Sequence, residues 1–221
     1  PRRLAVTLPG FHVTPAYLTR LDHVVADLSA SRGVPDDGVG GALRSVDQGR
    51  PWAAALEQAR RDGRIAVRVT HGDPKLDNIL FHETTGRALA VIDLDTVQPG
   101  LIQHDLGDCL RSCCNRRGES SDGTVAFDLD ICRAILGAYA EEMRGLLSEG
   151  DVAALYDGIR TLPYELGVRF LTDHLEDNRY FRVHSPGENL HKAMIQFALG
   201  ADIGRKEPQI RALITESFGA G

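Results

Sequence analysis

The stretch from His71 to Asn78 holds the kinds of side chain that phosphate chemistry requires. Asp73 can accept the proton of an attacking hydroxyl, Lys75 can contact phosphoryl oxygens, and Asn78 can offer an amide oxygen to Mg²⁺. Transfer of a phosphoryl group leaves a protein little covalent work, because orientation, metal binding and charge neutralisation supply most of the catalysis. The stretch therefore predicts a phosphoryl-transfer site.

A second acidic position follows an apolar run further along the chain. Asp93 ends the run 88–92, and Asp95 stands just beyond it. Because Mg²⁺ takes hard oxygen donors and keeps waters and phosphates at its other positions, Asp93 is the expected second protein ligand beside Asn78. Asp95 is interpreted as a residue that contacts either the metal or the substrate that accepts the phosphoryl group. Hydrogen bonding within its own loop is an equally good interpretation.

Other polar residues are expected to support the loop rather than to react. His71 is expected to brace the loop backbone. The resemblance described below implies that Asp105 and Asp108 are buried acceptors for it, because they stand where similar folds use an aspartate to bond this backbone. The simpler alternatives remain open at this stage: Asp73, Asn78 and Asp93 could be turn-forming residues, and Lys75 could be a solvated surface lysine.

Short strands are predicted around the two motifs. Ile65, Val67 and Val69 alternate with polar or small residues, which is typical of a strand that leads to His71. The apolar runs 79–81 and 88–92 flank a polar turn, which predicts a hairpin with carboxylates at one end.

The rest of the pattern is helical. A Thr-Pro start and apolar spacing predict a helix over 15–30, and Pro51 is expected to begin a helix that ends at Gly63. The glycine-rich residues 31–50 are predicted to be a flexible loop. Further helices are expected near 104–116, 128–148, 151–178, 187–203 and 208–218. We therefore expect an α+β, mostly helical fold, divided into a helical segment with the loop (1–63), a catalytic hairpin region (64–103) and a helical substrate-binding subdomain (104–221).

Composition narrows the class of protein. The formal net charge of −6 in 221 residues argues against binding along a nucleic acid backbone, which needs a dense basic surface. No apolar run approaches the roughly 20 residues that cross a bilayer, so no membrane contact and a cytoplasmic location are expected.

The motifs resemble those of a known superfamily. The run His71-x-Asp73-x-Lys75-x-x-Asn78 has the catalytic-loop spacing of protein-kinase-like enzymes, and Val91-Ile92-Asp93-Leu94-Asp95 stands where these place a metal-binding aspartate. The combination looks most like the aminoglycoside phosphotransferase and choline kinase branch. The resemblance implies the fold of a kinase-like C-terminal lobe, with ATP and Mg²⁺ as cofactors.

Within that branch the chain is most similar to the N-acetylhexosamine 1-kinases, from about residue 8 to about residue 200. The resemblance implies that Arg169 and Tyr180 line a sugar pocket and that an N-acetylhexosamine is phosphorylated at its anomeric hydroxyl. From the residues alone, Arg169 could instead pair with Asp173 along a helix. At Gly72 and His174 the chain differs from the residues that are usual in that family. Because both positions lie on the side of the acceptor sugar, three alternatives remain: an aminoglycoside kinase, another small-alcohol kinase, or a truncated non-catalytic sugar-binding relative.

A complete kinase of this type also has an N-terminal lobe that clamps ATP. No lysine precedes Lys75, and the cluster Gly38-Val39-Gly40-Gly41 is not a G-x-G-x-x-G phosphate loop. The N-terminal ATP lobe is therefore expected to be absent from this chain and to act as a partner, and the chain alone is expected to be poorly active.

Overall fold

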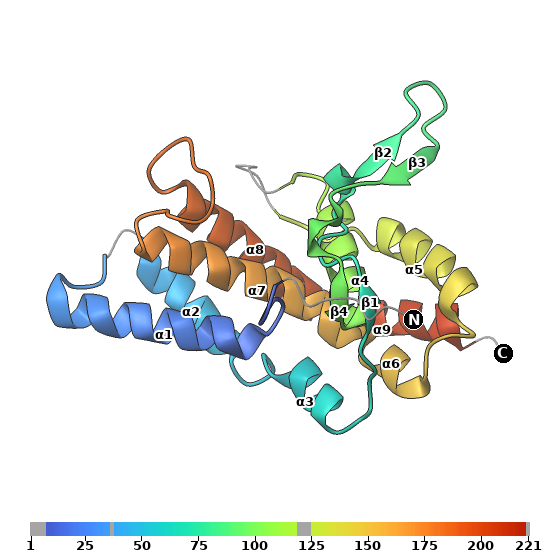
Figure 1. Cartoon of the computed structure of the whole chain (residues 1–221), viewed down its shortest axis with the longest axis horizontal. Coiled ribbons are helices and arrows are strands. Elements are labelled where there is room, and N and C mark those ends of the chain that lie inside the picture. The colour runs from blue at the N-terminus through green and yellow to red at the C-terminus, as the bar shows by residue number, and fades with distance from the viewer. Residues whose placement is uncertain (1–7, 36–37, 119–124, 220–221) are drawn as a thin grey trace.

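The structure, a computed structural model, describes residues 8–35, 38–118 and 125–219 (Figure 1). The first seven residues of the expected N-terminal segment thus lie outside the described part. The helices are α1 (Thr14–Ser31), α2 (Val39–Gly49), α3 (Ala55–Arg61), α4 (Ile102–Cys113), α5 (Leu129–Met143), α6 (Glu149–Ala153), α7 (Leu155–Leu175), α8 (Glu188–Arg205) and α9 (Glu207–Phe218). The strands are β1 (Arg68–Thr70), β2 (Ile79–Phe81), β3 (Ala88–Val91) and β4 (Gln98–Gly100).

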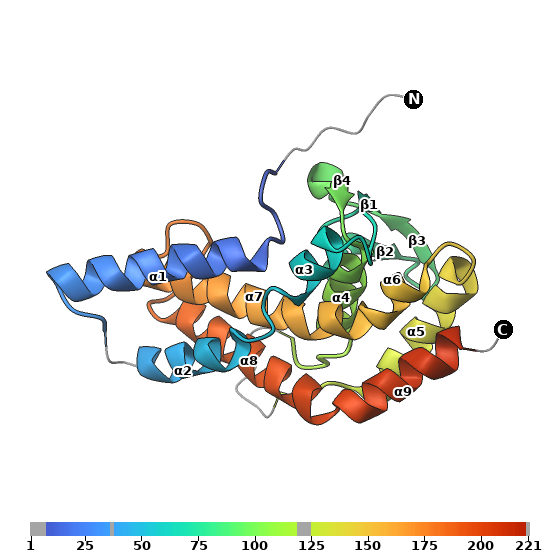
Figure 2. The same ribbon diagram turned by 90° about the horizontal axis from the view of Figure 1, so that it is seen from below.

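Helix α7 forms the centre of the molecule and packs against α1, α4 and α8 (Figure 2). Its first half places Leu155 and Ile159 in a core shared with α4, α5 and α9. Its second half places Val168 and Leu171 in a core shared with α1, α2 and α8. Each such side chain contributes about 1.5–3 kcal/mol by leaving water. One helix therefore sets the relative positions of the two cores.

Two antiparallel pairs of strands carry the catalytic segment. Strands β1 and β4 pair with Thr70 opposite Gln98, and β2 and β3 pair with Ile79 opposite Val91. The β2–β3 hairpin projects from the helical body (Figure 1). The expected α+β, mostly helical fold with a small hairpin is confirmed.

The glycine-rich segment was predicted wrongly in part. Residues 39–49 form α2 instead of a flexible loop, and Val39, Ala42 and Val46 are fully buried on one face of it. Gly49 leaves room for the ring of Tyr164, which lies 2.2 Å from where a Cβ would stand. Glycine in a helix costs about 1 kcal/mol per residue relative to alanine, and burial of the apolar face against α7 and α8 outweighs this cost.

Two boundaries also differ from the sequence pattern. The helix expected from Pro51 begins only at Ala55, although it ends before Gly63 (φ +69°), as glycine in the left-handed region favours. The strand expected from Ile65 is confined to β1. Ile65 is buried but Val69 is 67% exposed, because the sheet has two strands in the described part of the chain and no layer of described residues covers this face.

Candidate active site

The loop between β1 and β2 is held in place by hydrogen bonds between its backbone groups and side chains outside the loop. The carboxylate of Asp105, at the start of α4, accepts hydrogen bonds from the N–H groups of His71 (2.7 Å) and Gly72 (2.9 Å). Burial raises the pKa of Asp105, and these two hydrogen bonds oppose that rise. His71 Nε2 lies 3.1 Å from the carbonyl oxygen of Ile92, and Thr96 donates to the His71 carbonyl (2.6 Å). Asp105 and His71 thus contact the backbone that they were predicted to support.

Asp108 does not make the contact that the sequence suggested. Its Oδ1 accepts from Arg111 Nε at 2.7 Å, and it is not hydrogen-bonded to the loop backbone within the described residues. Arg111 is the i+3 neighbour of Asp108 on α4, so the two side chains meet on the helix surface, whereas Asp105 lies one turn earlier and reaches the loop. Asp108 nevertheless lines a small cavity together with Asp73.

Asp73, Lys75 and Asn78 converge inside the loop. Lys75 Nζ lies 2.6 Å from Asp73 Oδ2, and Asn78 Nδ2 lies 3.1 Å from the same oxygen and 2.8 Å from the Asp73 carbonyl. Burial lowers the pKa of Lys75, but the hydrogen bond and charge of Asp73 outweigh it, so the pKa is raised and the lysine stays charged. The loop therefore presents a carboxylate and a cation side by side.

Asn78 and Asp93 stand next to each other at the base of the hairpin. The Ile92 N–H donates to the Asn78 carbonyl (2.9 Å), which continues the pairing of β2 with β3. Asp93 adopts φ +62°, where the chain leaves β3 for a short 3-10 turn. Because the Asn78 amide nitrogen bonds to Asp73, its oxygen faces elsewhere and suits a hard cation. An amide oxygen and a carboxylate fit Mg²⁺ that keeps other ligands from water and phosphate.

Asp95 lies in the turn after Asp93 and is exposed. Its side chain lines neither of the two cavities that are described below. Within the described residues, no group of three or more His, Cys, Asp or Glu side chains forms a metal centre. Any metal here would rest on the Asn78 and Asp93 pair.

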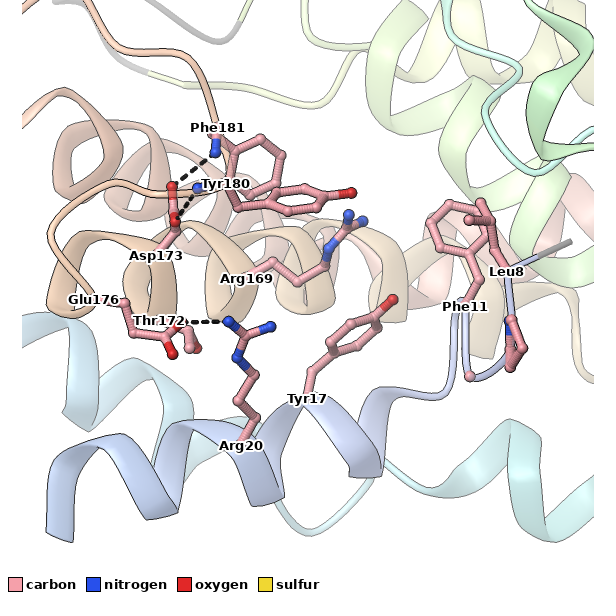
Figure 3. A pocket seen from close by; sticks show the side chains of 12 residues that line it. Leu8, Phe11, Tyr17, Arg20, Arg169, Thr172, Asp173, Glu176, Tyr180 and Phe181 are labelled. Atoms are coloured by element: carbon pink, nitrogen blue, oxygen red, sulfur yellow. Dashed lines mark hydrogen bonds and ion pairs between the residues drawn. The ribbon is translucent and has the colours of Figure 1, made fainter. Parts of the chain in front are cut away.

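A pocket of about 280 Å³ lies between α1 and α7 (Figure 3). The guanidinium of Arg169 lies in its wall, 5.2 Å from the ring centroid of Tyr17, 5.5 Å from that of Phe181 and 5.9 Å from that of Tyr180. Phe11 adds a fourth ring at 5.6 Å. We call this the aromatic pocket. Tyr180 is 70% exposed and therefore stands at its rim.

The loop that carries Tyr180 is tied to α7. Buried Asp173 accepts hydrogen bonds from the N–H groups of Tyr180 (2.7 Å) and Phe181 (2.9 Å) and from the Asn189 amide (2.8 Å). Asp173 is therefore engaged by the loop and not by Arg169, which overturns the pairing along the helix that the spacing allowed. Arg169 has no carboxylate partner among the described residues.

The aromatic pocket opens into a larger catalytic cleft of about 900 Å³. Phe11, Arg169, Tyr180 and Phe181 line both spaces. Asp73 and Lys75 line the cleft. A ligand seated against the aromatic rings can therefore reach toward the Asp73 carboxylate.

The comparison with known families agrees with this geometry. A model of the phosphotransferase enzyme family (APH) matches residues 2–146. The chain belongs to this family.

The matched range of this phosphotransferase contains the loop with Asp73 and the hairpin with Asp93. Arg169 and Tyr180 lie beyond it, so their roles rest on the pocket geometry and on the resemblance. In the part of the chain that the structure describes, no helix is long and apolar enough to span a bilayer.

A buried polar cluster behind the loop was not predicted from the sequence. His12 Nδ1 lies 2.8 Å from Glu165 Oε1, and His12 Nε2 lies 2.8 Å from the Gly72 carbonyl. Thr14, the threonine of the Thr-Pro start, is the first residue of α1 and donates to Glu165 Oε2 at 2.7 Å. The sequence offered one signal for this cluster, because Glu165 is an acidic residue among the buried positions of α7. No local pattern connects Glu165 to His12.

Proposed function

We propose that this phosphotransferase transfers the γ-phosphoryl group of ATP to the anomeric hydroxyl of an N-acetylhexosamine. The hydroxyl oxygen forms a bond to the γ-phosphorus, the bond from that phosphorus to the β–γ bridging oxygen breaks, and ADP leaves. The hydroxyl proton passes to Asp73. The products are a sugar 1-phosphate and ADP.

The observation that carries the proposal is the aromatic pocket and its opening toward Asp73. Sites for small ligands combine apolar and aromatic walls with a few convergent polar groups. In this pocket the rings of Phe181 and Tyr180 offer flat apolar surface, and Arg169 offers N–H donors that no described residue uses. An acetamido group matches both features, because its carbonyl oxygen accepts from Arg169 and its methyl group packs on the rings.

The remaining roles follow from the loop. Lys75, held beside Asp73, contacts the transferring phosphoryl oxygens. Asn78 and Asp93 hold Mg²⁺, which when bound neutralises charge on the ATP phosphates. Asp105 and His71 keep the loop backbone in place.

The charge of the cleft weighs against an aminoglycoside acceptor. A polycation needs a strongly acidic site, but the described lining is mainly cationic. Its cations are Lys75, Arg111, Arg116, Arg169, Arg182 and Lys192, and its carboxylates are Asp73 and Asp77. Four of these cations pair with carboxylates: Lys75 with Asp73, Arg111 with Asp108, Arg116 with Asp128 and Lys192 with Glu188. The lining therefore has no excess of carboxylates to hold an aminoglycoside, and a neutral sugar fits better.

A panel of acceptors tests this proposal. ADP release would be measured with N-acetylglucosamine, N-acetylgalactosamine, glucosamine, glucose and an aminoglycoside. We expect the two acetamido sugars to give the highest kcat/KM. Preference for glucosamine or the aminoglycoside would overturn the choice of acceptor, whereas no ADP release with any acceptor would favour a non-catalytic binding protein.

A variant pair tests the pocket itself. Arg169→Lys keeps the charge but loses the planar fork, so we expect the acceptor KM to rise about tenfold or more while the ATP KM stays unchanged. Arg133→Lys is the matched control, because Arg133 is exposed on α5 and pairs with Glu216 of α9. An unchanged acceptor KM in Arg169→Lys would remove Arg169 from the site.

A further inference from the structure

The cluster of His12, Glu165 and Thr14 is buried yet fully connected. The exposed fractions are 8% for His12, 1% for Glu165 and 2% for Thr14. Polar groups at this depth cost free energy unless they are hydrogen-bonded, and both His12 nitrogens and both Glu165 oxygens have partners. The cluster therefore avoids the cost of burial only while these hydrogen bonds stay intact.

The partners decide which atoms carry protons. The Gly72 carbonyl can only accept, so His12 Nε2 must donate to it. Glu165 accepts from Thr14 through one oxygen and faces His12 Nδ1 with the other. Burial lowers the pKa of His12, but the charge and hydrogen bond of Glu165 outweigh it and raise the pKa overall. Burial raises the pKa of Glu165, but His12 lowers it to about 2. The contacts and both shifts therefore favour an imidazolium paired with a carboxylate.

The pair joins three parts of the proposed site. His12 follows Phe11, which lines both the aromatic pocket and the cleft. Glu165 lies one helical turn before Arg169 on α7. Gly72 precedes Asp73 and has a left-handed backbone conformation (φ +88°). A Cβ at this position would also lie too close to the Thr96 carbonyl oxygen, at 2.9 Å. A change at His12 would therefore move the loop and the pocket wall together.

We propose that His12 and Glu165 are positioning residues, which hold the Asp73 loop at a fixed distance from the aromatic pocket through the Gly72 carbonyl. Neither residue touches the reacting atoms. Reaction rates depend steeply on such alignment, and a misplacement of about 1 Å can cost about 100-fold. The proposal rests on the proposed function, because it concerns the alignment of that base with that acceptor.

The alignment should depend on pH through His12. The groups that face it are Glu165 from α7, His104, Asp105 and Asp108 from α4, and the Gly72 carbonyl from the loop. Glu165 and the two aspartates favour the imidazolium, whereas His104 opposes it. As pH rises above the raised pKa, His12 loses a proton and its contact with Glu165 or Gly72 weakens. We expect kcat to fall on that alkaline side.

Paired variants of His12 test the proposal. His12→Leu removes the donor to Gly72, whereas His12→Gln keeps an amide N–H donor. We expect kcat to fall about tenfold or more in His12→Leu, with the ATP KM unchanged, and to recover largely in His12→Gln. In Glu165→Gln, the alkaline limb of the kcat profile should move to lower pH, because burial of His12 is no longer offset. His23→Gln, an exposed position on α1, is the control.

A second measurement is independent of activity. Amide hydrogen exchange of residues 71–73 should be faster in His12→Leu than in His12→Gln, with helix α5 unchanged as proof of folding. Equal exchange in the two variants, or a kcat and pH profile unaltered by Glu165→Gln in a folded protein, overturns the positioning role. If the unaltered protein transfers no phosphoryl group but the exchange difference is found, the proposed function fails while the clamp on the loop stands.

Discussion

Asp73 and Lys75 form a hydrogen-bonded ion pair across one residue of the catalytic loop, with Lys75 Nζ 2.6 Å from Asp73 Oδ2. Both side chains are about one-third exposed, with 29% for Asp73 and 34% for Lys75. An exposed pair of this kind contributes little to stability, because water screens it. Its effect is local, because it holds a cation and a carboxylate side by side in the wall of the cleft.

Replacing Asp73 by Asn should remove most activity without unfolding the protein. The amide keeps an oxygen for Lys75 and Asn78 but cannot accept the hydroxyl proton, so we expect kcat to fall about 10²–10⁴-fold. Asp27→Asn is the matched control, because Asp27 is an exposed carboxylate on α1 that does not line the cleft. Steady-state ADP release measures both. A kcat for Asp73→Asn within twofold of the unaltered protein would exclude Asp73 as the base.

Gly72→Ala should disturb the loop more than Gly86→Ala. Both glycines have positive φ, at +88° and +63°, so each alanine carries backbone strain of about 1–3 kcal/mol. A Cβ at Gly72 would also stand 2.9 Å from the Thr96 carbonyl oxygen, whereas nothing lies within 4 Å of a Cβ at Gly86. We expect loss of activity only in Gly72→Ala, and a larger drop in the free energy of unfolding in urea. Equal effects of the two substitutions would show that the contact with Thr96 is unimportant.

Two glycines in helices should respond to alanine with opposite signs. In Gly49→Ala the new Cβ would overlap the Tyr164 ring at 2.2–2.6 Å, so α2 must shift and we expect a loss of about 1–3 kcal/mol. In Gly137→Ala nothing lies within 4 Å, and alanine should stabilise α5 by about 0.5–1 kcal/mol. Urea unfolding checks both. A neutral Gly49→Ala would contradict the close packing of α2 on α7.

The stability of the protein should fall in mild acid because of His104. Burial, with the charge of His12, lowers the pKa of His104 from 6.5 to about 3. Between these values the unfolded chain binds a proton that the folded chain does not, so the free energy of unfolding decreases as pH falls, by at most about 1.4 kcal/mol per pH unit. His12 has a raised pKa, so its contribution is fully present below pH 6.5 and adds no slope there.

Urea unfolding at pH 7, 6 and 5 measures this slope. We expect His104→Gln to make the slope shallower, with the remainder coming from His174, whose pKa is also lowered by burial. His23→Gln, at an exposed position, should leave it unchanged. The pKa of Glu165 is lowered to about 2, so its contribution is lost only below about pH 4.5 and does not interfere. An equal slope in His104→Gln would assign the pH dependence to other groups.

The convergence of the residues proposed for phosphoryl transfer was predictable because it is local in sequence. Asp73, Lys75 and Asn78 share one loop, and the hairpin that brings Asp93 beside Asn78 is a short-range element with a clear alternation of apolar residues. The helices α7 and α8 were likewise predicted from their periodicity. Helix α2 was missed because burial of Val39 and Val46 decides its structure, and propensity alone argues against it.

By itself the sequence determined the residues that we propose for phosphoryl transfer, the hairpin and the order of most helices, since all of these depend on neighbours in the chain. Only the tertiary structure decided what surrounds them. The aromatic pocket joins Tyr17 to Arg169, and the buried ion pair joins His12 to Glu165. These contacts depend on how α1 packs on α7, and no local pattern encodes that packing, because any apolar face can be buried against any other.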